Sequence, residues 1–325
     1  MTQRSVILGC GHYLPRNVWT NDDLRARGVD TTDEWIQQRT GIKQRHAATE
    51  NEKTSDLAIA AARMALHNAG ITADQLDGIV LATTTPDCTF PATAVKVQAA
   101  LGMTRGFAFD VQSVCSGFLY ALSVANNFII TGQAKHLLVI GAETLTRLLN
   151  WHDRTTCVLF GDGAGAVVLG AATGTGTVAD RGILSTHLHS DGRTHDLLYT
   201  NGGPGSNGQV GTIQMEGKEV FKHAVTRLAE VVDEALNANH LNKSDIDWLI
   251  PHQANERIIL AMAEKLSLPT DRVIITIGEH ANTSAASVPL ALAHGQQKNK
   301  FKPGQLLLLE TMGAGLSWGA ALIRW

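Results

Sequence analysis

Three residues of this sequence could do chemistry together: Cys115, His252 and Asn282. Cys115 stands where the apolar segment 107–111 gives way to a helical pattern that begins at Ser116. A thiol at a helix N-terminus feels the positive end of the helix dipole, which favours the thiolate, and the backbone N–H groups that follow can stabilise an oxyanion. Cys115 is therefore a candidate nucleophile, and the alternative is a small residue of the core.

His252 and Asn282 occupy the same kind of position as Cys115. His252 follows the apolar segment 248–251 and precedes a helical pattern, where side chains reach a cleft at the edge of a sheet. Asn282 stands at a later junction, where its alternative role is a helix N-cap. A thiolate could take an acyl group from a thioester, while two neutral N–H donors stabilise the enolate left when carbon dioxide departs from a second substrate. The set therefore fits a decarboxylative condensation.

Alternating apolar runs and helical patterns must position these residues. Short runs rich in Val, Ile and Leu predict an α/β fold whose strands are buried on both faces. The predicted strands are Val6–Gly9, Ile79–Thr83, Phe107–Val111, Leu137–Gly141, Val158–Phe160, Ala166–Leu169, Trp248–Pro251, Val273–Thr276, Leu306–Glu310 and Ala320–Trp325. The predicted helices are Ser55–Asn68, Ala92–Leu101, Ser116–Thr131, Gly217–Ala238, Ala254–Leu266 and Ser284–Gly295.

The sequence also contains a weak internal repeat. The segment around Asp77 resembles the one around Asp247, and Ala121-Leu122 resembles Ala291-Leu292 at the same spacing. This pattern predicts two related halves, 1–170 with the cysteine and 171–325 with a linker, the histidine and the asparagine. The repeat would place Asn282 opposite Cys115, unless the match between short α/β patterns arose by chance.

Composition excludes several classes of protein. A chain of 325 residues with 44% hydrophobic residues can bury a large core, and its formal charge of −3 gives no electrostatic case for binding nucleic acid or membrane. No apolar run approaches the roughly 20 residues of a membrane span, and the start lacks the pattern of a secretory leader. We therefore expect a cytoplasmic protein.

The cysteines and histidines show no metal or disulfide spacing. Cys10, Cys88 and Cys157 are far apart in the sequence and are interpreted as packing residues with free thiols. His187 and His189 lie in a histidine-rich stretch without cysteine or acidic partners at a recognisable metal-binding spacing. We predict no metal.

Several motifs together resemble the β-ketoacyl-acyl-carrier-protein synthase III family, the initiating condensing enzymes of type II fatty acid synthesis in the thiolase superfamily. The resemblance covers essentially the whole chain. It implies a thiolase-like five-layered αβαβα sandwich of two pseudo-repeated halves, usually a homodimer. The motifs are Trp35-Ile-Gln-Gln-Arg-Thr-Gly41, the Cys115 segment, Phe160-Gly-Asp-Gly-Ala-Gly165, Pro251-His-Gln-Ala-Asn255, Asn282-Thr-Ser-Ala-Ala-Ser287 and Gly313-Ala-Gly-Leu-Ser-Trp-Gly319.

This resemblance implies roles for the catalytic residues. Cys115 would accept the acyl group, while His252 and Asn282 would bind the carbonyl of the malonyl thioester and promote decarboxylation. The oxyanion hole would consist of backbone N–H groups of Cys115 and of the loop at Ala314 and Gly315. Ala314 replaces a commoner glycine, and the backbone donor survives this change if φ stays negative. The resemblance implies no cofactor, because the coenzyme A thioester is a substrate.

The resemblance also implies binding residues. Those expected to contact coenzyme A are Thr31, Trp35, Arg39, Arg154, Met215, Gly217, Phe221, Ala254 and Asn255. Trp35, Arg39 and Arg154 would hold the adenine and the phosphates, which suit an aromatic face and guanidinium groups; the others would line the pantetheine tunnel. For Trp35 and Phe221 the alternative is core packing.

Phe90 resembles a residue that crosses the dimer to close the partner's acyl pocket. Arg257 matches a surface arginine that meets the acidic carrier protein, and Lys222 and Lys265 could extend this patch. A solvated helix face is the alternative for these charges.

The expected reaction joins an acyl-coenzyme A primer, acetyl above all, to malonyl-acyl-carrier protein and yields a 3-oxoacyl-carrier protein, coenzyme A and carbon dioxide. A specialised-acyl or secondary-metabolite condensing enzyme with the same three residues is the close alternative. A cysteine hydrolase shares the order Cys, His and Asn, but the papain-type signature is missing and the repeat is the wrong architecture. A degraded, non-catalytic subunit would be expected to lose one of the three residues, and all are present.

Overall fold

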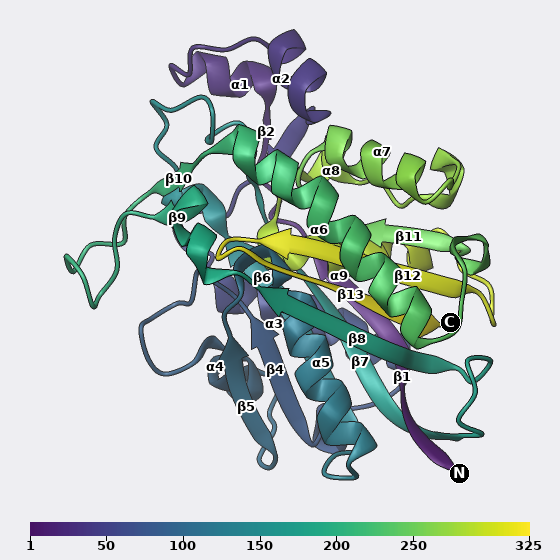
Figure 1. The fold of residues 1–325 in the computed structure, drawn as a ribbon. Helices are drawn as coiled ribbons and strands as arrows, with labels where there is room; N and C mark the ends of the chain where they lie inside the picture. Colours follow the sequence, from purple (N-terminus) through teal and green to yellow (C-terminus); the bar gives the residue numbers. More distant parts are fainter.

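Two β-sheets form the frame of this chain, which a computed structural model describes over residues 1–325 (Figure 1). The first sheet has the order β1-β7-β6-β4-β5 and the second β11-β12-β13-β8. The strands of the first sheet are β1 (Thr2–Tyr13), β4 (Gly78–Ala82), β5 (Phe107–Val111), β6 (His136–Thr144) and β7 (Asp162–Gly174). Those of the second are β8 (Gly182–Ser190), β11 (Trp248–Pro251), β12 (Leu306–Gly313) and β13 (Ser317–Arg324).

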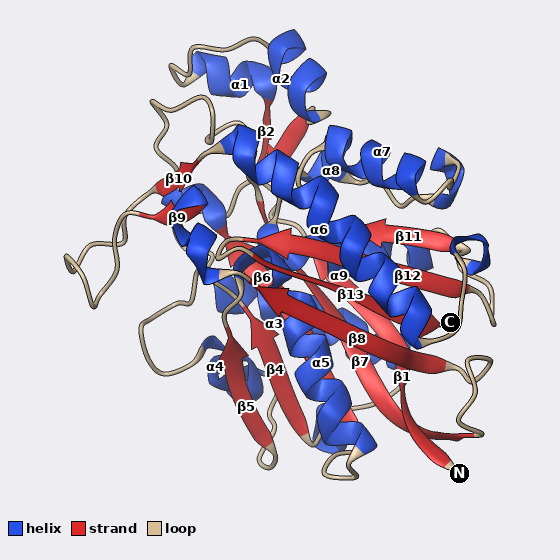
Figure 2. Ribbon diagram, in the orientation of Figure 1, coloured by secondary structure: helices blue, strands red, loops and turns tan.

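Helices form three layers around the two sheets (Figure 2). The middle layer packs between the sheets and contains α5 (Gly117–Ile130) and α9 (Ser287–Gln297). The outer face of the first sheet carries α3 (Thr54–Ala69) with α4 (Thr93–Ala100) beside it, and α6 (Gly217–Ala238) with α7 (Glu256–Lys265) covers the second. This order confirms the predicted five-layered αβαβα sandwich.

Smaller elements gather at the end of the sandwich where α1 and α2 lie in Figure 1. They are β2 (Val18–Thr20), α1 (Asn21–Ala26), α2 (Asp33–Thr40), β3 (Gln44–His46), β9 (Leu198–Thr200), β10 (Ile213–Met215) and α8 (Ile277–His280). Thr32 caps α2, because its hydroxyl accepts a hydrogen bond from the Trp35 N–H at 3.1 Å. None of the helices combines the length and apolarity needed to cross a membrane.

The two halves repeat the same strand order, because β1-β7-β6-β4 corresponds to β8-β13-β12-β11. Asp77 directly precedes β4 and Asp247 directly precedes β11, so the two carboxylates occupy equivalent positions in the two halves. Asp77 accepts a hydrogen bond from the backbone N–H of His136, the first residue of β6, and Asp247 accepts one from Leu306, the first of β12. The match confirms the two pseudo-repeated halves. β7 ends at Gly174, so the first sheet continues beyond residue 170.

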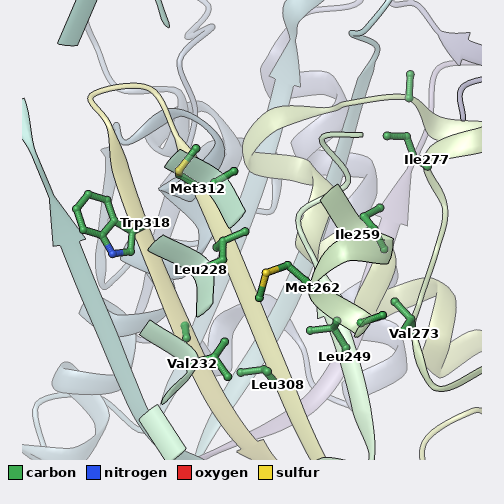
Figure 3. Packing of buried hydrophobic residues seen from close by; sticks show 14 of the residues in the cluster. Leu228, Val232, Leu249, Ile259, Met262, Val273, Ile277, Leu308, Met312 and Trp318 are labelled. Atoms are coloured by element: carbon green, nitrogen blue, oxygen red, sulfur yellow. The ribbon is translucent and has the colours of Figure 1, made fainter. Parts of the chain in front are cut away.

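Strand β12 shows why the predicted strands read as continuous apolar runs. Leu306 and Leu308 face the core beneath α6 and α7, whereas Leu307 and Leu309 face the middle helical layer. Figure 3 shows the first of these cores, where Leu308 lies near Val232 and other apolar side chains. Both faces of the strand are buried away from solvent, so every position favours an apolar residue.

The predicted strand Val158–Phe160 is wrong. This segment forms turns, and it pairs with another part of the chain only at an isolated bridge between Phe160 and Asn282. The Asn282 N–H donates to the carbonyl of Leu159 at 2.9 Å, and the Gly161 N–H donates to the carbonyl of Asn282 at 3.0 Å. The segment therefore holds Asn282 in place instead of extending a sheet.

The predicted strand Val273–Thr276 is also wrong. It makes one isolated bridge, to Leu249, because a side chain takes up the hydrogen bonds that a neighbouring strand would make. The Gln253 amide donates to the carbonyl of Ile274 at 3.0 Å and accepts from the Thr276 N–H at 2.7 Å. This contact braces the segment that carries His252 against the start of α8. The other predicted strands and helices are confirmed, with ends that differ by a few residues.

Candidate active site

The structure brings Cys115, His252 and Asn282 together in the wall of one cavity of about 120 Å³. The three side chains come from three separate junctions: the 3₁₀ turn η2 (Val114–Ser116), the end of β11 and the segment before the 3₁₀ turn η7 (Ser284–Ala286). Each of the three residues is at most 6% exposed. The predicted convergence of the two halves therefore places a thiol, an imidazole and an amide around one largely apolar space.

The backbone of Cys115 is held by the second half of the chain. The hydroxyl of Thr311 in β12 donates to the Cys115 carbonyl at 2.8 Å, and the Ser116 hydroxyl donates to the carbonyl of Ser317 in β13 at 2.8 Å. Val114 takes up a positive φ of 46°, a backbone strain that persists only where the surroundings enforce it. The nucleophile candidate is therefore fixed before any substrate arrives.

Burial decides the protonation state of Cys115. Removal from water raises the pKa of the thiol to about 12, although the neighbouring Ser284 hydroxyl acts in the opposite direction. The resting site therefore holds the thiol, not the thiolate that the helix dipole would favour, because desolvation is the largest influence on this pKa. Cys115 is a thiol at neutral pH, and it must lose its proton as it attacks.

His252 is a neutral imidazole in this site. Its backbone N–H donates to the Glu310 carbonyl on the neighbouring strand at 2.8 Å, which fixes the residue at the end of β11. Burial lowers the pKa of His252 to about 3. A neutral ring carries one N–H donor, and Nδ1 of this ring is buried without a hydrogen-bond partner.

The Asn282 amide is oriented by its own loop. Its Oδ1 accepts a hydrogen bond from the backbone N–H of Ser284 at 2.9 Å. The carbonyl side of the amide is thus occupied, and the Nδ2 group remains to donate to a ligand in the cavity that Asn282 lines.

The glycine-rich loop lies directly against the cysteine. A Cβ atom on Gly313 would lie 2.8 Å from the backbone nitrogen of Cys115, so only glycine fits there. Ala314 does not take up a positive φ, which meets the condition stated for its N–H, and Gly315 does, at 129°. The Ser317 hydroxyl donates to the Ala314 carbonyl at 3.0 Å and steadies the loop.

Five of the nine residues expected to contact coenzyme A line the cavity. They are Met215, Gly217, Phe221, Ala254 and Asn255. The Asn255 amide also caps α7 through its Oδ1 and donates through Nδ2 to the carbonyl of Arg39 at 2.9 Å. This bond joins the mouth of the cavity to α2.

The other expected residues form a second group around Trp35. The guanidinium carbon of Arg39 lies 4.4 Å from the Trp35 ring centroid, and that of Arg154 lies 5.1 Å away. Arg154 also donates to the carbonyl of Asp30 at 2.9 Å. Thr31 directly follows Asp30 in the sequence. It is buried, and its hydroxyl has no hydrogen-bond partner. An indole with two guanidinium groups beside it is a surface suited to an aromatic base and to phosphates.

Two of the expected docking residues, Arg257 and Lys222, neighbour Phe221, and the third, Lys265, lies apart from them. Arg257 is exposed at the start of α7, with its guanidinium carbon 5.6 Å from the ring centroid of Phe221 in the cavity wall. Lys222 is exposed on α6 next to Phe221, whereas Lys265 stands at the other end of α7, about 12 Å away along the helix axis. Phe90 is 82% exposed in the loop before α4 and does not line the cavity.

Sequence reasoning missed part of the cavity wall and two buried carboxyl groups. The missed wall residues include Leu159, Leu198, Val220, Ala224, Leu228 and Met312. Glu143 and Glu310 are fully buried, and burial raises the pKa of Glu143 to about 7 and that of Glu310 to about 8. Four leucines precede Glu310 in an apolar strand. An acidic residue in such a strand was the sequence signal that this carboxyl group is buried.

Known proteins resemble this chain over its whole length. Family models for 3-oxoacyl-[acyl-carrier-protein (ACP)] synthase III match residues 109–192, and models for the C-terminal part of that enzyme match residues 236–325. The chain is 65% identical to the β-ketoacyl-[acyl-carrier-protein] synthase III of Rhodospirillum centenum, with full coverage of both chains. It is 62% identical to that of Paramagnetospirillum magneticum, again over 100% of both.

Solved structures agree with these matches. The crystal structure of 3-oxoacyl-[acyl-carrier-protein] synthase III from Aquifex aeolicus superimposes with a TM-score of 0.93 at 46% identity, over 99% of this chain and 100% of that one. The enzyme from Pseudomonas aeruginosa gives 0.92 at 43% identity, over 99% and 98%. The chain therefore belongs to the 3-oxoacyl-[acyl-carrier-protein] synthase III family.

Proposed function

We propose that this enzyme condenses an acyl-coenzyme A primer with malonyl-acyl-carrier protein and thereby initiates fatty acid biosynthesis. The products are a 3-oxoacyl-carrier protein, coenzyme A and carbon dioxide. The observation that carries the proposal is the convergence of Cys115, His252 and Asn282 in one buried cavity. The proposed primer is acetyl, and the product assay described below tests this choice.

In the first half-reaction, the sulfur of Cys115 attacks the carbonyl carbon of the primer thioester. The carbonyl oxygen becomes negative, and the backbone N–H of Cys115 together with the loop at Ala314 and Gly315 forms its oxyanion hole. The close approach of Gly313 to the Cys115 nitrogen supports this assignment. Collapse of the intermediate leaves the acyl group on Cys115 and releases coenzyme A.

In the second half-reaction, malonyl-carrier protein enters the emptied cavity. The His252 imidazole and the Asn282 amide donate hydrogen bonds to its thioester carbonyl, which becomes an enolate oxygen when carbon dioxide leaves. Both donors are buried, so they act where water does not weaken them. The enolate carbon then attacks the acyl group on Cys115 and frees the thiol.

The two substrates would reach the cysteine by the same mouth. Trp35, Arg39 and Arg154 would hold the nucleotide end of coenzyme A, and the five cavity residues would hold its pantetheine arm. Arg257, beside Phe221 at the mouth, would attract the acidic carrier protein. Lys222 would extend this contact, while the position of Lys265 makes it the weakest candidate.

We further propose a cytoplasmic homodimer that uses no cofactor. The exposed Phe90 is suited to enter a partner subunit. All four cysteines are free, which fits a reducing compartment. The chemistry described above needs only side chains, backbone N–H groups and the two thioesters.

A product assay tests the proposed function. Wild-type enzyme, acyl-coenzyme A thioesters of increasing length and malonyl-carrier protein are combined, and the carrier-bound products are identified by mass spectrometry. We expect a 3-oxobutanoyl product from the acetyl thioester and none with Cys115→Ala. Preference for a longer or branched primer would replace the initiating role with that of a specialised condensing enzyme, and hydrolysis without condensation would refute the proposal.

A further inference from the structure

A buried carboxyl group lies behind the nucleophile. Glu143, near the end of β6, is fully buried and pairs with no cation. Its Oε2 accepts hydrogen bonds from the Thr85 hydroxyl at 2.6 Å and from the Thr84 N–H at 3.1 Å. Desolvation holds the pKa of this group near 7, so at neutral pH it can either give or take a proton.

The backbone geometry directs Glu143 toward the turn η7. Residues 141 and 143 lie on the same face of β6, because side chains alternate along a strand. A Cβ atom on Gly141 would clash with the carbonyl oxygen of Ala285, the middle residue of η7. The Glu143 side chain therefore points to the layer that contains Ser284 and, beyond it, η2 with Cys115.

Ser284 is the group between the thiol and the carboxyl. It is fully buried and has a positive φ of 49°. Its hydroxyl lies close enough to Cys115 and to Glu143 to lower the pKa of both. The hydroxyl nevertheless makes no hydrogen bond of ordinary geometry with any group. A buried hydroxyl with this freedom can turn from one neighbour to the other.

We propose that Ser284 and Glu143 form a proton relay that serves Cys115 in the acyl transfer described above. As the sulfur of Cys115 bonds to the thioester carbon, the thiol proton passes to the Ser284 oxygen and the Ser284 proton passes to the Glu143 carboxylate. The bond between the carbonyl carbon and the sulfur of coenzyme A breaks, and coenzyme A leaves as a thiolate that takes a proton from solvent.

The second half-reaction runs the relay backwards. When the enolate carbon bonds to the acyl group, the thioester bond to Cys115 breaks and the cysteine sulfur leaves as a thiolate. The proton held on Glu143 returns through Ser284 to this sulfur. One turnover therefore leaves the relay as it began and consumes one proton from solvent, as the loss of a carboxylate as carbon dioxide requires.

The relay supplies the base that Cys115 needs in order to lose its proton. Burial makes Cys115 a weak acid, and His252 is a poor base because burial lowers its pKa to about 3. Glu143 is a far better proton acceptor than His252 at neutral pH. Ser284 touches the reacting thiol, whereas Glu143 acts only through Ser284.

Alkylation of Cys115 tests the relay without any acyl substrate. Wild type, Glu143→Gln, Glu143→Asp and Ser284→Ala are treated with iodoacetamide from pH 5.5 to 9, and the modification of the Cys115 peptide is followed by mass spectrometry. We expect the wild-type rate to rise with an inflection near pH 7, where Glu143 loses its proton. Glu143→Gln and Ser284→Ala should lose the inflection and react about 10²-fold more slowly at pH 8. Glu143→Asp should keep an inflection.

Asp162 provides the matched control. It is another fully buried carboxyl, which accepts hydrogen bonds from the Thr146 hydroxyl and the Ala48 N–H, and burial raises its pKa to about 6. Asp162→Asn should leave the inflection in place. Wild-type alkylation kinetics in both Glu143→Gln and Ser284→Ala, or loss of the inflection in Asp162→Asn alone, would overturn the relay.

Acyl loading of the same variants separates the relay from the proposed function. If the primer loads on Cys115 while both relay variants alkylate like wild type, the relay fails and the proposed function stands. If no primer loads but alkylation follows Glu143, the proposed function fails and the relay stands. Should Glu143→Gln not fold, Ser284→Ala decides the matter alone, because it removes one oxygen atom and keeps the backbone.

Discussion

Decarboxylation of the malonyl thioester should not respond to pH where an ordinary histidine titrates. Burial lowers the pKa of His252 from 6.5 to about 3. At about 1.4 kcal/mol for each pKa unit, this shift favours the neutral ring by roughly 5 kcal/mol. At pH 5.5 an exposed histidine is about nine-tenths protonated, whereas His252 should stay almost wholly neutral. The same neutral N–H donor should therefore act throughout the range from pH 5.5 to 8.

The assay isolates this step in the Cys115→Ala background, where no condensation can follow. Release of carbon dioxide from malonyl-carrier protein is measured between pH 5.5 and 8, with circular dichroism to show that the fold persists. We expect a flat profile. His252→Ala in the same background should lower the rate about 10²–10³-fold at every pH, which is the usual cost of losing one preorganised donor.

An inflection near pH 6.5 would refute this reasoning if it disappeared in His252→Gln. It would mean that the imidazole gains a proton in the working range, so that an imidazolium, not a neutral ring, meets the enolate. An inflection that survives His252→Gln would belong to another group and would leave the neutral histidine intact.

Three other predictions concern binding and stability. Trp35→Ala should raise the KM for acyl-coenzyme A about tenfold in steady-state kinetics and leave the KM for malonyl-carrier protein unchanged, because only coenzyme A carries an adenine; an equal rise in both would argue for a packing role. Arg257→Glu should raise the KM for malonyl-carrier protein but spare loading from coenzyme A, whereas Lys265→Glu at the far end of α7 should have little effect; equal loss of both steps in Arg257→Glu would remove the docking assignment. Burial raises the pKa of Glu310 from 4.5 to about 8, so the native state binds more protons than the unfolded state between these values and its stability falls as pH rises. The contribution of Glu310 to the free energy of unfolding, measured with urea, should be about 2–3 kcal/mol smaller at pH 8 than at pH 6. Glu310→Gln should reduce the pH dependence of this free energy. An unchanged pH dependence in Glu310→Gln would show that another group is responsible.

The fold could be predicted where a strand is a short run rich in apolar residues, even at the edge of a sheet. Phe107–Val111 and Trp248–Pro251 match β5 and β11 residue for residue, because the apolar run ends where the sheet ends. β8 was missed, because this edge strand mixes half-buried polar residues with apolar ones. In it His187 and His189 both bond to Glu234 of α6, so a histidine-rich stretch was in fact a strand. Hydrogen bonds to side chains far away in the sequence help to stabilise such a strand, and the local sequence pattern gives no sign of these bonds.

The candidate site could be predicted as far as its three reacting side chains. Cys115, His252 and Asn282 each follow a recognisable junction, and the repeat brings the junctions together. The protonation state of Cys115 could not be predicted, because it depends on how deeply the thiol is buried. Nor could the contact between Ser284 and Glu143 be predicted, since it depends on which face of β6 meets η7.

The most direct test of the central claim is the intact mass of the enzyme after it meets acetyl-coenzyme A. Wild type should gain one acetyl group, Cys115→Ala should gain none, and addition of malonyl-carrier protein should remove the acetyl group and produce 3-oxobutanoyl-carrier protein. An acetyl group that survives in Cys115→Ala, or one on wild type that malonyl-carrier protein cannot discharge, would contradict the assignment of Cys115 as the acyl carrier in a condensation.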